Sequence, residues 1–401
     1  MRLRPAFLLL VLLTAVSSCG SEPSPDPPEP DPAPRVVAGY FTEWGVYGRD
    51  YLVKNLRTSG AADRLTHLKY AFGKVTGGRC AVGDDWAAHR KPIEAADSVD
   101  GVADLPADPL RGSFGQLRKL KAAYPHLKLL WSFGGWTGSA GFTEAARDPA
   151  AFAASCRKLL DDTRWAGLFD GVDIDWEYPN ACGLACDTSG PDALTRMLAE
   201  LRTALGPDAL ISTAVPGDVS KLRATDYAGA ARYANWLGAM TYDYFGTAVT
   251  AKRYTTAPHS ALSAYPGIPR DTATTEATVT ELLNLGVPAE KLLLGVGFYG
   301  RGWTGVTGAG PGATATGPAP GRFGKGIEDY YVLADRCPPT GTVGGTAYAR
   351  CGAQWWSYDT PETIAAKVAY ARGRSLGGLF AWELSGDTPD AGLLTAMSGR
   401  P

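Results

Sequence analysis

An acidic cluster inside an otherwise apolar stretch is the part of this sequence best suited to chemistry. Residues 170–179 read D-G-V-D-I-D-W-E-Y-P, with Asp173, Asp175 and Glu177 at alternate positions. Because side chains alternate between the faces of a strand, these three carboxyl groups share one face at intervals of about 6.6 Å. The apolar residues between them take the other face. The pattern predicts a strand that packs against helices on one side and runs into an active site on the other, with Asp170, of opposite parity, in a supporting role.

The spacing of these carboxyl groups indicates acid–base chemistry. Three carboxyl groups on one strand face cannot all ionise cheaply, so the cluster should keep at least one proton near neutral pH and titrate as a coupled group. A protonated Glu177 can act as a general acid, and its conjugate base can activate water. A Ca²⁺ loop is the alternative, but it needs a glycine at its sixth position and oxygen ligands at alternate sites, which Ile174 and Trp176 do not provide.

The same segment resembles the D-x-x-D-x-D-x-E signature of glycoside hydrolase family 18, the chitinases and their relatives, with the W-E-Y-P continuation typical of the chitinase branch. The resemblance implies that Glu177 is the catalytic acid, that Asp175 orients the 2-acetamido group of the substrate, and that Asp173 shares charge and a proton with Asp175. It also implies a retaining reaction in which the acetamido oxygen is the nucleophile, an exception to the two-carboxylate scheme of most glycosidases. Glu177 then becomes the base that activates water.

Other motifs of this family end other predicted strands. W-S-F-G-G-W at 131–136 resembles the S-x-G-G motif, in which Ser132 could hydrogen-bond Asp173 and the paired glycines let a sugar approach the backbone. M-T-Y-D at 240–243 implies that Tyr242 bonds the acetamido carbonyl group and that Asp243 contacts the sugar or stabilises its distorted ring. Taken alone, these motifs also fit a turn and a core position. The resemblance assigns further positions to the sugar pocket: Tyr40, Phe72, Gly134, Gly135, Trp136, Tyr178, Met240 and Trp382.

The rest of the chain alternates between strand-like and helix-like stretches. Alternation of this kind predicts an α/β fold with parallel strands and right-handed crossovers. Eight strands suit a (β/α)8 TIM barrel: 36–41, 65–72, 127–135, 168–177, 209–215, 234–243, 292–299 and 377–382. Helical periodicity covers 112–123, 149–162, 190–204, 273–285 and 360–373, with N-caps expected at Ser189, Thr272 and Thr360.

The predicted catalytic domain, residues 36–401, is longer than a bare barrel of roughly 250 residues, so it must contain insertions. One candidate is 76–105. The other is 304–354, between strands seven and eight, which resembles the small α+β insertion that walls the cleft in many members of the family. No internal repeat or separate carbohydrate-binding module is apparent in the sequence.

The beginning of the chain predicts export. Residues 1–19 carry two arginines, then an apolar stretch too short to span a membrane, and are interpreted as a signal peptide. The V-S-S-C ending resembles a bacterial lipobox that would place a lipid on Cys19, and a plain signal peptidase site remains the alternative. Residues 20–35 are a proline-rich, semi-rigid linker. We therefore expect an extracellular protein, either secreted or lipid-anchored at the cell surface.

Composition limits the partners and cofactors. A net charge of -2 and the absence of a basic block argue against nucleic acid, and we expect a monomer that binds a neutral polymer. Setting Cys19 aside, six cysteines remain, and we pair Cys182 with Cys186, Cys337 with Cys351, and Cys80 with Cys156. The four histidines are scattered and no C-x-x-C occurs, so neither a metal nor a cofactor is expected.

A glycine-rich motif, G-V-G-F-Y-G at 295–300, matches the dinucleotide-binding fingerprint, but no helix pattern follows it. The sequence thus predicts an exported chitinase that acts on β-1,4-linked N-acetylglucosamine polymers. An endo-β-N-acetylglucosaminidase acting on N-glycans is the alternative within the hydrolases. A chitin-binding lectin on the same fold is the alternative outside them, although such lectins have usually lost the acid.

Overall fold

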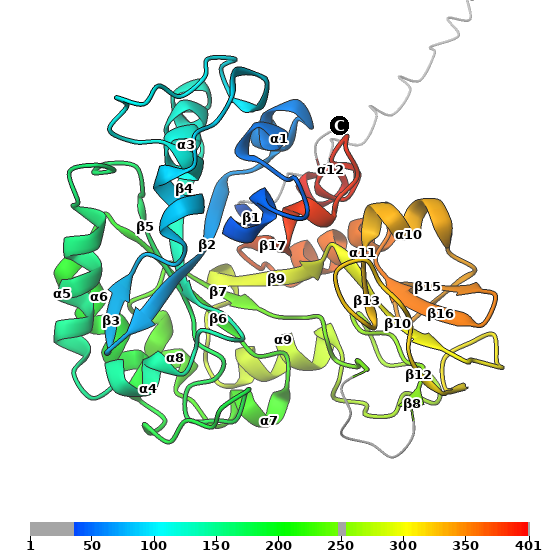
Figure 1. The fold of residues 1–401 in the computed structure, drawn as a ribbon. Helices are drawn as coiled ribbons and strands as arrows, with labels where there is room; N and C mark the ends of the chain where they lie inside the picture. Colours follow the sequence, from blue (N-terminus) through cyan, green and yellow to red (C-terminus); the bar gives the residue numbers. More distant parts are fainter. Residues whose placement is uncertain (1–35, 248–253, 400–401) are drawn as a thin grey trace, which may run out of the picture. The chain divides into compact units, whose positions relative to one another are not determined.

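Eight parallel strands close into a barrel in the computed structural model, which describes residues 36–247 and 254–399 (Figure 1). Their order is β1-β17-β9-β7-β6-β5-β4-β2, and β1 pairs with β2 to close the ring. The barrel strands are β1 (Val36–Thr42), β2 (His67–Thr76), β4 (Lys128–Gly134), β5 (Gly171–Asp175), β6 (Leu210–Val215), β7 (Trp236–Ala239), β9 (Leu292–Gly297) and β17 (Gly378–Trp382). The predicted (β/α)8 barrel is confirmed, and each predicted stretch overlaps its strand, although β1 and β2 run past the predicted ends at 41 and 72. The predicted signal peptide 1–19, the linker 20–35 and Cys19 lie outside the described residues.

Helices surround the barrel where the periodicity predicted them. The longer ones are α3 (Gly112–Ala123), α5 (Pro149–Leu160), α6 (Ala193–Leu205), α9 (Thr275–Asn284) and α11 (Pro361–Gly373). Short helices complete the layer: α1 (Val53–Thr58), α2 (Ala61–Arg64), α4 (Gly141–Ala145), α7 (Val219–Leu222), α8 (Tyr227–Ala231) and α12 (Gly392–Ser398). Within the described part of the chain, no helix is long and apolar enough to cross a membrane.

The ends of these helices correct two predicted N-caps. Thr360 caps α11 as predicted, since its hydroxyl group accepts a hydrogen bond from the backbone N–H of Thr363 in the first turn of the helix. The predicted cap at Thr272 was wrong, because the N-cap of α9 is Thr274, two residues later. Ser189 was also wrong, because its hydroxyl donates to Asp187 (2.7 Å) and α6 begins only at Ala193. A side chain whose hydroxyl group is hydrogen-bonded within the preceding loop is not placed to cap the helix.

Two hydrophobic cores hold the barrel together. The larger core lies between strands and helices and includes Val172, Ile174 and the fully buried Trp165. The predicted apolar face of β5 therefore does pack against the helix layer. The smaller core fills the barrel interior around Tyr40 and Phe380.

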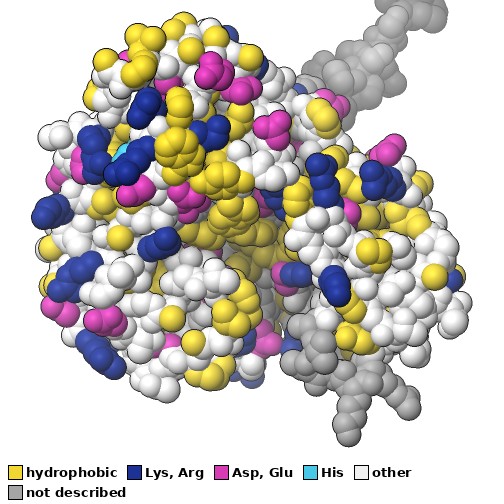
Figure 2. Space-filling model, viewed as in Figure 1, with side chains coloured by type: hydrophobic (Ala, Val, Ile, Leu, Met, Phe, Trp, Pro, Cys, Tyr) yellow, Lys and Arg dark blue, Asp and Glu magenta, His cyan; other side chains and the backbone are white. Residues whose placement is uncertain are grey.

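An antiparallel sheet is inserted between β9 and β17, on the right in Figure 1. Its strands are β10 (Tyr299–Thr304), β12 (Gly317–Pro318), β13 (Ile327–Asp329), β14 (Gly341–Val343), β15 (Thr346–Cys351) and β16 (Gln354–Tyr358), with α10 (Tyr330–Arg336) among them. The sheet thus extends beyond the predicted 304–354 at both ends. The motif 295–300 runs from β9 directly into β10, so no helix follows it. A hollow with apolar side chains lies between barrel and insertion (Figure 2).

The other predicted excursion, 76–105, begins with β3 (Arg79–Ala81), which pairs antiparallel with β2. It continues through two short helices, η2 (Trp86–Arg90) and η3 (Ala95–Asp97). The three predicted disulfides are all present, and Cys80–Cys156 ties this excursion to α5.

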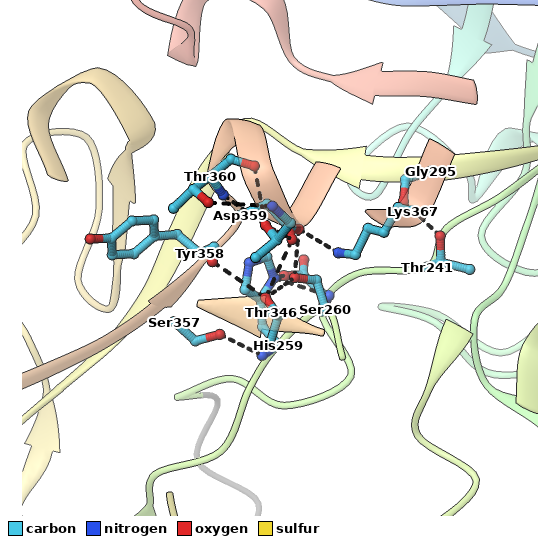
Figure 3. Close-up of polar contacts among 12 residues, drawn as sticks. Thr241, His259, Ser260, Gly295, Thr346, Ser357, Tyr358, Asp359, Thr360 and Lys367 are labelled. Carbon is cyan, nitrogen blue, oxygen red and sulfur yellow. Dashed lines mark hydrogen bonds and ion pairs between the residues drawn. The ribbon is translucent and has the colours of Figure 1, made fainter. Parts of the chain in front are cut away.

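A buried ion pair connects the end of the inserted sheet to helix α11, which packs outside the barrel (Figure 3). Asp359 follows β16, and its carboxylate accepts from the ammonium group of Lys367 on α11 at 2.5 Å. The hydroxyl groups of Ser260 and Thr363 also donate to it, each at 2.8 Å. Thr346 adds a longer hydrogen bond to Asp359, at 3.4 Å. Both charged side chains are fully buried, so the pair depends on these partners.

Candidate active site

The three signature carboxyl groups gather where β5 ends. Asp173 and Asp175 are buried, and Glu177 lies two residues past Asp175 and is half-buried. In parallel barrels the carboxyl ends of the strands form the face on which active sites are built. The predicted alternation therefore places the acidic face of β5 toward the barrel interior and its mouth.

Asp173 accepts hydrogen bonds from four different strands. Tyr40 on β1 and Ser132 on β4 donate to its Oδ2 at 2.8 and 2.7 Å. Lys69 on β2 and Ser212 on β6 donate to its Oδ1 at 2.8 and 2.5 Å. The predicted bond from Ser132 is confirmed. The predicted sharing of a proton between Asp173 and its neighbour on β5 stays a prediction.

The charges of the cluster are unequally distributed. Burial alone would raise the pKa of Asp173, but the Lys69 ammonium group and the hydrogen bonds hold it below its usual value. Burial, followed by the charges of Glu177 and Asp173, raises the pKa of Asp175 well above its usual value. Burial also raises the pKa of Glu177, to about 7. The cluster thus favours an anion at its base, at Asp173, and the raised pKa values of Asp175 and Glu177 favour protons toward the cleft, as a general acid requires.

One oxygen of Asp175 is poised for a ligand. Its Oδ1 is buried and has no hydrogen-bond partner among the described residues. Buried polar atoms are normally paired, so an unpaired one at an active-site position indicates a group that finds its partner in the substrate. The oxygen is therefore available to an amide such as the acetamido group.

The backbone around Asp175 and Glu177 is held by residues of the 131–139 loop. Ser139 accepts from the N–H of Glu177 at 2.8 Å and donates to the carbonyl oxygen of Gly135 at 2.8 Å. A Cβ on Gly134 would lie 2.3 Å from the carbonyl oxygen of Asp175, and one on Gly135 would lie 2.5 Å from the ring of Phe72. Both glycines also have positive φ angles, of 109° and 79°. They are needed for close packing within the protein, not only for approach of a sugar.

Aromatic rings line the mouth of the barrel as predicted. Trp382 stacks on Phe72 with centroids 5.6 Å apart and meets Tyr40 edge-on at 5.1 Å. Met240 and Tyr242 pack into the same inner core. Apolar ring faces suit the C–H-rich faces of sugars, and the tyrosine hydroxyl groups add polar contacts.

Asp243 belongs to an ion pair with the insertion. Arg301 on β10 donates to both of its carboxylate oxygens, at 2.8 and 2.6 Å. Burial would raise the pKa of Asp243, but the Arg301 guanidinium and the neighbouring His259 lower it. Asp243 therefore stays ionised and links the substrate side of the barrel to the wall formed by the insertion.

A small pocket beside Glu177 has an exposed aromatic rim. Trp136, which is 49% exposed, Tyr178 and Leu184 line it. The ammonium group of Lys221 on α7 lies 4.0 Å from the centre of the Tyr178 ring. Trp136 and Tyr178 thus lie beside Glu177, and their contacts with a sugar stay a prediction.

Asp170 lies at the opposite end of β5. Its carboxylate accepts from Lys121 at 2.7 Å and from the backbone N–H of Leu129 at 2.8 Å. It connects α3, β4 and β5, which agrees with the predicted supporting role.

Several residues of the site were not predicted. Lys69 is the lone charge inside the predicted strand L-T-H-L-K-Y-A-F, and Ser212 interrupts A-L-I-S-T-A-V, so each carried a signal of polarity in a buried strand. Arg301 and Ser139 carried no comparable signal, because their partners are distant in sequence or belong to the backbone.

The barrel, the acidic strand and the aromatic mouth together define a glycoside hydrolase. The chain belongs to the family "Glycosyl hydrolases family 18", whose model matches residues 36–387. It is 54% identical over 391 residues to Chitinase 63 of Streptomyces plicatus, covering 96% of this chain. It is 58% identical over 357 residues to Chitinase C of Streptomyces lividans, covering 88% of this chain.

These two curated relatives are longer than the matched region, which spans 63% and 57% of their lengths. Among solved structures, the catalytic domain of the psychrophilic chitinase B from Arthrobacter TAD20 is similar, with a TM-score of 0.85 and 32% sequence identity. That match covers 90% of this chain and 94% of the solved one.

Proposed function

We propose that this chain is a chitinase that hydrolyses β-1,4 bonds between N-acetylglucosamine units by retaining, substrate-assisted catalysis. The observation that carries the proposal is the buried, unpaired Oδ1 of Asp175 beside Glu177, whose pKa burial raises to about 7. The names of the two Streptomyces relatives support the same substrate.

In this reaction Glu177 donates its proton to the glycosidic oxygen and the leaving sugar departs. Asp175 and Tyr242 hold the 2-acetamido group, whose oxygen attacks the anomeric carbon and forms an oxazolinium ion. The carboxylate of Glu177 then takes a proton from water, which opens this ion with retention of configuration. Trp382 forms the floor under the reacting sugar.

The test uses the full chain with the hexamer of N-acetylglucosamine, and mass spectrometry identifies the products. We expect fragments of two to four sugars, and Glu177→Gln should lower turnover by roughly 10²-fold or more while hexamer binding persists. Full activity of this variant would contradict the assignment of the acid. An intact hexamer together with release of glycans from a glycoprotein would favour the N-glycan reaction, and binding without any cleavage would favour a lectin.

We also propose that the protein is exported and held at or released from the cell surface, on the basis of residues 1–35. Mass spectrometry of the mature N-terminus tests this proposal. A diacylated Cys19 supports an anchor, another cleaved N-terminus supports secretion, and an intact Met1 contradicts export.

A further inference from the structure

A lysine lies inside the barrel, directly beneath the catalytic carboxyl groups. The side chain of Lys69 is 2% exposed. Its ammonium group donates to Asp173 Oδ1 at 2.8 Å and to the Tyr40 hydroxyl at 3.3 Å. It also lies 4.9 and 5.4 Å from the ring centres of Tyr40 and Phe380. A fully buried lysine is rare and requires a partner that compensates its lost hydration.

We propose that Lys69 is a positioning residue for the acid–base reaction: it keeps Asp173 as a carboxylate, so that the protons of the acidic cluster are held by Asp175 and Glu177. This inference rests on the proposed function, because that reaction uses those protons. Lys69 itself does not reach the substrate in this mechanism. It acts through Asp173.

The geometry supports this role over that of an ordinary structural ion pair. Buried ion pairs contribute little net stability, and apolar residues of similar volume often replace them without loss. Asp173 already receives three hydroxyl groups, from Tyr40, Ser132 and Ser212, which would also satisfy a neutral carboxyl group in part. What the hydroxyl groups cannot supply is a full positive charge. The ammonium group therefore decides the charge of Asp173.

The charge of Asp173 affects the two carboxyl groups above it. Asp173 raises the pKa of Asp175, whereas the Lys69 ammonium group lowers it, so the two charges of the ion pair act on Asp175 in opposite directions. Without the Lys69 ammonium group, the negative charge of Asp173 has no cationic partner. Asp173 must then either bind a proton or repel negative charge on Asp175 and Glu177. Either result changes how protons are distributed. The charged and titratable groups that face this cluster are Tyr40 on β1, His67 on β2, Tyr178 after β5, Tyr242 and Asp243 after β7, Lys221 on α7, and Asp175 and Glu177.

The first test needs no substrate and no activity. In the wild-type full chain with ¹³Cγ-labelled aspartate, the Asp173 signal is assigned by its loss in Asp173→Asn. We expect Asp173 to remain ionised down to below about pH 4, the usual range of an aspartate. In Lys69→Met we expect its titration to move upward by at least one pH unit. An Asp173 that is protonated at pH 6 in the wild type, or that titrates equally in both proteins, overturns the proposal.

The second test uses the pH profile of kcat/KM on a soluble chitooligosaccharide. Loss of a nearby positive charge raises the pKa of every acid around it, so we expect the alkaline limb of Lys69→Met to move to higher pH. The double variant Lys69→Met/Asp173→Asn removes both charges, and its alkaline limb should return toward that of the wild type. A lower kcat with unmoved limbs in Lys69→Met would show a purely structural role and overturn the proposal.

A second buried lysine provides a matched control. Lys367 also forms an ion pair with an aspartate, Asp359, and both are fully buried, but this pair lies outside the acidic cluster. Lys367→Met should lower stability without moving the titration of Asp173. If Lys69→Met does not fold, Lys69→Gln replaces it, and the wild-type titration alone still decides the ionisation of Asp173. An inactive protein with an ionised Asp173 would count against the proposed function and not against this one.

Discussion

Replacing Lys367 by methionine should weaken the protein through one identifiable contact. Its ammonium group meets Asp359 at 2.5 Å, and neither side chain has solvent exposure. Removing one partner of a buried pair leaves an uncompensated charge, which typically costs about 3–5 kcal/mol. Asp359 keeps the hydroxyl groups of Ser260 and Thr363, so we expect the lower end, about 3 kcal/mol. At roughly 2 °C per kcal/mol for a large domain, Tm should fall by about 6 °C.

Thermal and urea unfolding, followed by circular dichroism, measure this change. Lys158→Met is the matched control, because Lys158 is an exposed lysine on a helix of the same barrel and should change stability by no more than about 0.5 kcal/mol. The double variant Lys367→Met/Asp359→Asn removes both charges and should recover part of the loss. A loss below about 1 kcal/mol in the single variant, or a double variant less stable than the single one, would show that the lone Asp359 charge does not destabilise the fold.

Three further predictions concern the acid and its surroundings. Because Glu177 must be protonated to act and its pKa is about 7, kcat/KM should fall about tenfold per pH unit above pH 7, and a profile flat to pH 9 would contradict this. Because the pKa of Glu177 is raised in the folded protein, the folded state is favoured while Glu177 is protonated. The free energy of unfolding therefore falls as the pH rises through 7. Glu177→Gln should therefore unfold at a higher temperature than the wild type at pH 8 but not at pH 4, and equal Tm values at pH 8 would argue against it. Arg301→Met frees Asp243 and should lower kcat/KM by roughly tenfold to 100-fold, with unchanged kinetics as the contrary result.

The sequence was most informative where the signal was local. The alternation in β5 predicted which side chains of that strand face the helices and which face the cleft, because period two follows from strand geometry alone. The aromatic positions on β1, β2 and β17 followed from the resemblance, and the structure brings Tyr40, Phe72 and Trp382 into contact.

Features that depend on distant partners could not be predicted. The cation beneath the cluster, Lys69, is 104 residues from Asp173 in sequence, and Arg301 is 58 residues from Asp243. Ser189 is a residue type that often caps helices, but its hydroxyl group donates a hydrogen bond to the neighbouring Asp187 instead. The insertion boundaries shifted because β10 continues directly from β9, so one apolar run contains the end of the barrel strand and the start of another sheet.

Substrate assistance distinguishes this reaction from that of most glycosidases, and a comparison of two substrates tests it. The hexamer of N-acetylglucosamine and the fully deacetylated hexamer are offered separately to the enzyme, and early products are followed by NMR at the anomeric carbon. Substrate assistance predicts cleavage of the acetylated hexamer to β-anomeric products and no cleavage of the deacetylated one, which lacks the nucleophile. Equal cleavage of both hexamers, or α-anomeric first products, would contradict it.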